Sequence, residues 1–158
     1  MSEENTFRSE WEDAFNGYKE GQRPCNEFDW FAIDSKGEVA CFITAGFAFV
    51  PKLVFRDKET LWKIYNYFYK EPEDYAYIHK ISSLMEYDVS HYATKGLYSY
   101  DNPSDIDKPY QLIRSPKTPI HVSELSFEIR EWLEPLTLRE LSFADSAMID
   151  MSKHFDCI

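Results

Sequence analysis

The side chains that could do chemistry are few and widely spaced. Asp88, Ser90 and His91 lie close together and are the residue types of an acyl-transfer site. Neighbours in sequence do not reach the order of nucleophile, base and orienting acid that such a site needs, so polar residues at a helix end explain them better. Three cysteines without a Cys-x-x-Cys pair argue against a thiolate zinc site and a disulfide framework. Cys41 is expected to be a small buried hydrophobe on a strand.

Patterns for binding metals and cofactors are also missing from the sequence. The four histidines are isolated, and no two have the i, i+3 or i+4 spacing that places two imidazoles on one helix face. Asp101, Asp105 and Asp107 resemble part of a calcium loop but lack its glycine and its bidentate glutamate. No nucleotide-binding, zinc-protease or hydrolase motif occurs. The sequence therefore indicates no catalytic residue, no metal ligand and no cofactor.

Acidic residues are interleaved with tyrosines in two stretches, residues 69–77 and 98–110. Tyrosine rings give buried contact area, and carboxylates around them attract and orient Lys and Arg side chains. We predict that these stretches bind a basic protein. The alternative is that the rings belong to the core and the acids form a solvated surface. The predicted contact residues are Glu71, Glu73, Asp74, Tyr75, Tyr98, Tyr100, Asp101, Asp105 and Asp107.

Charge and composition limit the class of protein. The 158 residues include 17 Lys+Arg and 28 Asp+Glu, a formal net charge of −11. This charge disfavours nucleic acid and anionic membranes as partners and favours rapid encounter with a basic protein. With 44% hydrophobic and 17% aromatic residues, the chain is expected to fold rather than to be a disordered acidic tail.

The length and the N-terminal sequence lead to further expectations. A chain of this length fits one domain over residues 1–158. The acidic start lacks the basic and apolar regions of a secretory signal, and no stretch of apolar residues is long enough to span a membrane. We therefore expect a cytoplasmic protein. The sequence leaves its oligomeric state open.

Apolar spacing and turn residues predict the first half of the fold. A stripe that includes Trp11 predicts a helix over residues 6–16 that ends at Gly17. Two apolar runs within residues 28–45, split by Ser-Lys-Gly, predict a β-hairpin whose first strand is covered on both faces. Asp57 is the predicted N-cap of a helix over residues 58–70.

The second half is predicted to add helices and strands in mixed order. One helix is predicted over residues 75–86, and a second is predicted from residue 123 or 126 to about 133. Strands are predicted over residues 97–100, 110–113 and 136–143, the last with a bulge. We therefore predict a single α+β domain, in which an antiparallel sheet of about five strands has three or four helices packed on one face.

Two motifs in the chain are structural in kind. The first is a tryptophan-bearing hairpin, Asp29-Trp30-Phe31-Ala32-Ile33-Asp34, followed by Gly37, Ala40, Phe42 and Thr44-Ala45-Gly46. The second is a strand, Gly96-Leu97-Tyr98-x-Tyr100-Asp101, followed by Tyr110, Pro116 and Pro119. Together they resemble a group of small, largely uncharacterised bacterial proteins over about residues 28–120. Neither motif carries catalytic residues.

Two hypotheses about function remain after these observations. Proteins of similar size and acidity often act as immunity partners of secreted toxins, which implies a non-enzymatic inhibitor that covers a basic toxin domain. The alternative is a small-molecule enzyme or sensor with an aromatic pocket between sheet and helices, which the many tyrosines and tryptophans favour.

Overall fold

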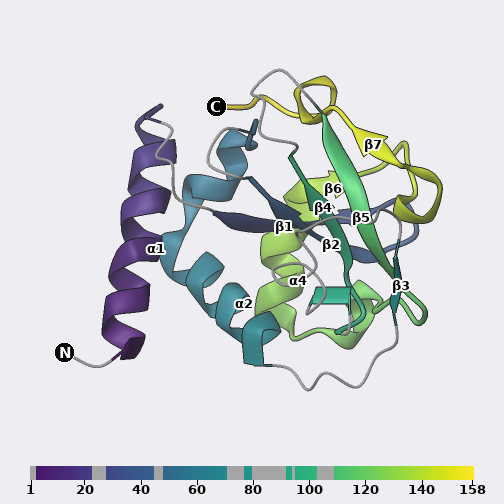
Figure 1. The fold of residues 1–158 in the computed structure, drawn as a ribbon, viewed down its shortest axis with the longest axis horizontal. Coiled ribbons are helices and arrows are strands. Elements are labelled where there is room, and N and C mark those ends of the chain that lie inside the picture. The colour runs from purple at the N-terminus through teal and green to yellow at the C-terminus, as the bar shows by residue number, and fades with distance from the viewer. Residues whose placement is uncertain are drawn as a thin grey trace.

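The chain folds into one sheet with α-helices on one side of it and at the edge of the molecule (Figure 1). The computed structural model describes residues 3–22, 28–44, 48–70, 77–79, 92–93, 95–102 and 109–158. The helices are α1 (Glu3–Lys19), α2 (Lys58–Lys70) and α4 (Phe127–Leu133), and the strands are β1 (Asp29–Asp34), β2 (Val39–Ile43), β3 (Tyr77–His79), β4 (Tyr98–Asp101), β5 (Tyr110–Pro116), β6 (Thr137–Leu138) and β7 (Met148–Ile149). Five 3₁₀ turns connect them, η1 (Lys52–Arg56), η2 (Val122–Glu124), η3 (Glu134–Leu136), η4 (Phe143–Asp145) and η5 (Met151–Lys153). Within the described part of the chain, no helix combines the length and apolar character needed to cross a membrane.

The sheet is mixed rather than antiparallel. Its strand order is β3-β5-β4-β2-β1-β6, and β7 also pairs with β5. The β1–β2 and β4–β5 pairs are antiparallel, as predicted. However, β2 runs parallel to β4 and β1 runs parallel to β6. The α+β class is therefore confirmed, whereas the purely antiparallel sheet is wrong. Parallel neighbours need long connections, and here α2 belongs to the segment between β2 and β4.

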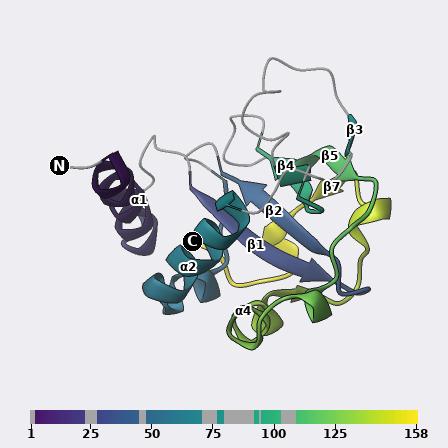
Figure 2. The ribbon, with the colours of Figure 1, turned by 90° about the horizontal axis from the view of Figure 1, so that it is seen from below.

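Both faces of the central hairpin are covered, as predicted. Successive strand residues point to opposite faces of a sheet. On one face Trp30 stacks on Phe42 with 4.6 Å between ring centroids, and Phe143 from the C-terminal region packs against Phe42 at 6.0 Å. On the other face Phe31 contacts Phe68 of α2 at 5.0 Å. Figure 2 shows α2 and α4 together on that side of β1. The hairpin is thus the centre of the core.

Helix α1 lies at the edge of the molecule and is longer than predicted (Figure 1). Its apolar side packs on α2 and η1, with Trp11 5.0 Å from Trp62 and Phe15 5.2 Å from Phe55 between ring centroids. Gly17 does not end the helix, because the helix continues to Lys19.

The end of α1 is set by a glycine four residues beyond the predicted one. Gly21 has φ of +75°, and its N–H donates to Tyr18 O at 2.9 Å. The Gln22 N–H donates to Gly17 O at 2.8 Å. These two bonds form a Schellman motif, which satisfies the last carbonyl groups of the helix and favours glycine at the left-handed position.

Two predicted elements in the second half are wrong. A helix was expected over residues 75–86, but Tyr77–His79 form β3, which pairs with the end of β5; the rest of that range lies outside the described residues. The predicted strand over residues 136–143 is only two residues long, β6, and Phe143 belongs to η4. Both errors concern segments whose conformation depends on pairing with distant strands.

Candidate protein-binding surface

Of the nine residues predicted to contact a partner, the structure describes three, and all three are buried. Tyr98, Tyr100 and Asp101 of β4 are 4%, 0% and 2% exposed. A partner cannot reach these side chains without opening the fold, so the prediction is wrong for these three residues. The other six lie outside the described residues: Glu71, Glu73, Asp74, Tyr75, Asp105 and Asp107.

The two tyrosines of β4 bind the chain itself. The Tyr100 hydroxyl donates to Ser146 O at 2.6 Å, and its ring stacks on Phe42 at 5.0 Å. The Tyr98 hydroxyl donates to a carboxylate oxygen of Glu38 at 2.9 Å. Burial raises the pKa of both phenols above their usual value, so both act as hydrogen-bond donors. Their role is to hold the C-terminal region and the β1–β2 turn against the sheet.

Cys41 is buried on β2, as predicted, and neither its burial nor its pKa favours a reactive thiol. Burial raises its pKa well above the usual value, with the Asp29 carboxylate adding to the shift. A nucleophilic cysteine needs the opposite shift, because the thiolate is the reactive form. Nearby, the Tyr92 hydroxyl donates to Asp29 Oδ2 at 2.6 Å. This hydrogen bond joins β1 to Tyr92, which lies on the helix side of the sheet.

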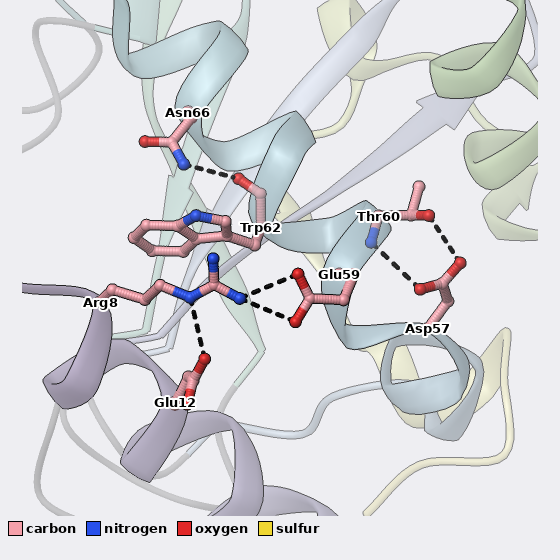
Figure 3. Close-up of polar contacts among 7 residues, drawn as sticks. All are labelled: Arg8, Glu12, Asp57, Glu59, Thr60, Trp62 and Asn66. Carbon is pink, nitrogen blue, oxygen red and sulfur yellow. Dashed lines mark hydrogen bonds and ion pairs between the residues drawn. The ribbon is translucent and has the colours of Figure 1, made fainter. Parts of the chain in front are cut away.

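Arg8 is the centre of a charged cluster that joins α1 to α2 (Figure 3). Its Nη2 donates to both carboxylate oxygens of Glu59, at 2.7 and 2.9 Å, and its Nε donates to Glu12 at 2.9 Å. The guanidinium lies over the Trp62 ring, 5.4 Å from its centroid. The hydrogen bond from Arg8 lowers the pKa of Glu12. These charges are paired within the fold, so the cluster contributes to helix packing and is a poor candidate for a binding site.

Asp57 caps α2, as the sequence predicts, and its removal should weaken the fold. Its Oδ1 accepts from Thr60 N at 3.1 Å and its Oδ2 accepts from Thr60 Oγ1 at 2.6 Å (Figure 3). Loss of such a cap costs about 1 kcal/mol, so Asp57→Ala should lower the free energy of unfolding by about that amount at neutral pH. The measurement is urea denaturation of both proteins.

The cap should also depend on pH in a defined direction. The hydrogen bonds from Thr60 lower the pKa of Asp57 in the folded state. A carboxyl with a lowered folded pKa stabilises above its unfolded pKa of about 3.9, and this stabilisation is lost as the pH falls through the folded pKa. The difference between wild type and Asp57→Ala should therefore shrink below about pH 4. Asp57→Asn is the matched control, since it can still cap but cannot titrate. A difference that grows in acid would contradict this assignment.

Helix α4 presents an aromatic ring among carboxylates. Ser126 is its N-cap, and Ile129, Trp132 and Leu133 face the core, as predicted. Phe127 does not belong to this inward-facing stripe. It is 66% exposed, the most exposed large hydrophobic side chain in the described part of the protein. We define the α4 surface as Phe127 with the exposed side chains around it on this helix and its flanking turns, Glu124, Glu128, Arg130, Glu131 and Glu134.

The α4 surface is acidic and slightly hollow. Phe127, Arg130, Glu131 and Glu134 line an open depression of about 290 Å³. Lys63 pairs with Glu128 at 3.1 Å and Arg139 pairs with Glu134 at 3.2 Å, so part of the negative charge is offset by pairs that are themselves exposed. Glu131 has no ion-pair partner among the residues that the structure describes. A cationic group could therefore meet Glu131 without displacing another residue.

The sequence contained a signal for this surface. On a helix, core residues recur at i, i+3 and i+4, and the stripe of Ile129, Trp132 and Leu133 leaves Phe127 outside it. An aromatic residue outside the core stripe and beside Glu128 indicates an exposed ring. The contact residues predicted from the sequence are instead tyrosines and acids of two acidic stretches, and the tyrosines on β4 are core residues.

Three comparisons with known proteins give no further guidance. The chain matches no family model, no curated protein and no solved structure.

Proposed function

We propose that this chain is a non-enzymatic binding protein whose α4 surface contacts a basic protein. The observation that carries the proposal is the 66% exposure of Phe127 between carboxylates of the same helix. An aromatic anchor within a polar rim is the common composition of an interface hot spot. The formal charge of −11 adds long-range attraction toward a basic partner.

The proposed partner is a basic toxin domain, which the chain inhibits by stoichiometric binding as an immunity protein does. Support comes from the resemblance of the hairpin and β4 motifs to small bacterial proteins, together with the acidity of the chain. Most of the described residues of these motifs are buried, Trp30 and Tyr100 completely. The resemblance therefore concerns the fold, and the contacts are proposed to lie elsewhere, on α4.

The alternative, an enzyme or sensor with an aromatic pocket between sheet and helices, has weaker support. Phe31 packs against Phe68 at 5.0 Å and against Tyr92 at 6.1 Å between ring centroids. These rings pack against one another and fill the space on the helix side of β1. Their contacts favour a packed core over a ligand pocket.

Substitutions on the α4 surface test the proposal. The proposal predicts that the reading frame immediately upstream encodes a secreted protein with a basic C-terminal domain. That domain, once purified, is the probe, and the measurement is the kinetics of its binding to the immobilised chain. Phe127→Ala should weaken binding at least about 30-fold, since a hot-spot residue contributes 2 kcal/mol or more. Glu131→Lys should slow association at low salt, and added salt should reduce the difference.

A charge reversal on another helix serves as the control. Glu10 is exposed on α1, away from the α4 surface, and Glu10→Lys changes the net charge by the same amount as Glu131→Lys. We expect Glu10→Lys to slow association much less than Glu131→Lys. Equal effects of the two reversals, or unchanged affinity in Phe127→Ala, would rule out α4 as the contact surface.

A further inference from the structure

A groove near the end of α1 differs in charge from the rest of the molecule. It has a volume of about 500 Å³ and lies between the last residues of α1, the η1 turn and Ile158. Lys19, Lys52 and Arg56 line it, with Glu20 as the one acidic residue among its described lining residues. In a chain with a formal charge of −11, three cations in one groove are unexpected. The volume lies within the range of small-molecule sites.

The floor of the α1–η1 groove is apolar and is held in place by ring packing and backbone hydrogen bonds. Phe55 is buried and stacks against Phe28, with 5.6 Å between ring centroids. Ile158 is joined to Val50 through two backbone hydrogen bonds, from Ile158 N to Val50 O at 2.9 Å and from Val50 N to Ile158 O at 3.5 Å. A ligand with an apolar body would therefore find a surface that is already formed, which lowers the entropic cost of binding.

Two of the three cations, Arg56 and Lys52, differ in how firmly the fold holds their side chains. Arg56 is fixed, because it donates to Leu53 O at 2.6 Å and to Trp132 O, and its guanidinium lies 4.8 Å from the centroid of the Trp132 ring. Lys52 pairs with Asp156 at 3.1 Å, but both side chains are largely exposed. Exposed pairs contribute little free energy, so an anionic ligand can take the place of Asp156 on Lys52.

The backbone around the groove favours one kind of anion. Phosphate sites commonly use backbone N–H groups at a helix N-terminus. Here the groove adjoins the C-terminal end of α1, where the Gly21 and Gln22 N–H groups already donate to Tyr18 O and Gly17 O. Recognition would thus depend on the lysine and arginine side chains together with the apolar floor. That combination suits a singly charged head on an apolar body.

We propose that the α1–η1 groove binds a small organic anion, a carboxylate or sulfonate with an aliphatic or aromatic body. The apolar body lies against Phe55 and Ile158, and the anionic head lies between Lys19 and Lys52. None of the described residues that line this groove belongs to the α4 surface, and the proposal does not depend on the function proposed for that surface.

A titration of the full chain with octanoate tests the proposal. The readout is the position of the backbone amide NMR resonances of Gly21 and Phe55. Octanoate should shift both resonances at millimolar concentration. 1-Octanol, which has the same chain without the charge, should bind at least about tenfold more weakly, and inorganic phosphate should leave both resonances unchanged. Equal binding of octanol, equal shifts with phosphate, or no shift with octanoate would each overturn the proposal.

A double variant identifies the cations. Lys19→Gln with Lys52→Gln should weaken octanoate binding about tenfold, because both charge-assisted contacts are lost. The folded structure should survive, since the ion pair that Lys52 loses with Asp156, within the described part of the chain, is exposed. Lys117→Gln is the matched control, an exposed lysine outside the groove lining, and should bind as the wild type does. Unchanged binding in the double variant, or an equal loss in the control, would refute the assignment.

Discussion

Asp34→Ala should lower the free energy of unfolding by about 3–4 kcal/mol, although it removes only one carboxylate. Asp34 is 1% exposed. Its Oδ1 accepts from the backbone N–H groups of Lys36 and Glu38, both at 2.9 Å, and its Oδ2 accepts from Phe143 N at 2.8 Å. The first two bonds close the β1–β2 turn, and the third holds η4 against the sheet.

The expected size follows from what remains after the carboxylate is removed. The Phe143 N–H is buried, so the alanine variant would leave it without an acceptor, and a buried unsatisfied donor costs about 1–3 kcal/mol. The N–H groups of Lys36 and Glu38 are partly buried and can recover part of their loss through water. Urea denaturation of wild type and variant gives the difference.

Two further variants separate the contributions of Asp34. Asp34→Asn keeps one carbonyl acceptor but places an amide donor opposite the other N–H groups. Its free energy of unfolding should therefore lie between those of wild type and Asp34→Ala. Asp150→Ala is the control, since Asp150 accepts from Ser152 N at 3.1 Å in an exposed turn, where water can replace the carboxylate. It should cost less than about 1 kcal/mol. A similar cost for Asp34→Ala and Asp150→Ala would contradict the role given to burial.

The part of the fold that the sequence predicts well is local. Helix α2 matches the predicted bounds of residues 58–70, because Asp57 gives a cap signal and the apolar spacing is regular. The β1–β2 hairpin is equally clear, since its turn and strands are adjacent in sequence. In both cases the interactions that define the element join residues a few positions apart, so the sequence pattern contains the relevant information.

Long-range pairing is the part that local patterns do not contain. The parallel contacts of β2 with β4 and of β1 with β6 join segments from different parts of the chain. The alternation of apolar and polar residues in a strand shows which residues share a face of the sheet. It does not show which other strand will pair beside it. Tyr77–His79 is strand because it lies beside β5, although its surroundings in sequence favour a helix. The mixed sheet follows from such pairings.

The same reason explains the wrong contact residues on β4. Tyr98 and Tyr100 lie near an acidic loop in sequence, which suggested an exposed surface. In the structure β4 lies between β2 and β5 in the middle of the sheet, so both side chains are covered. Proximity to charge in the sequence therefore does not predict exposure on a central strand. On α4 the helical period does predict it, because one side of a surface helix always faces water.

Phe42→Ala should destabilise the fold by about 3–5 kcal/mol, whereas Phe127→Ala should change stability by less than about 0.5 kcal/mol. The Phe42 ring lies 4.6 Å from the ring of Trp30, 5.0 Å from Tyr100 and 5.2 Å from Tyr110. Its removal would leave a cavity between β2 and the C-terminal region, and the surrounding rings can close it only in part. Phe127 is exposed and leaves no such cavity.

The two variants make the same chemical change, so they separate packing from recognition. Urea denaturation followed by tryptophan fluorescence measures stability, and Trp30, which stacks on Phe42, reports on the core directly. Binding to the basic domain, measured in the absence of urea, should be weakened at least about 30-fold in Phe127→Ala and retained in the fraction of Phe42→Ala that stays folded. A stability loss in Phe127→Ala as large as that in Phe42→Ala would mean that Phe127 is a packing residue. In that case its exposure could no longer be explained by a partner, because the ring would already be needed by the fold.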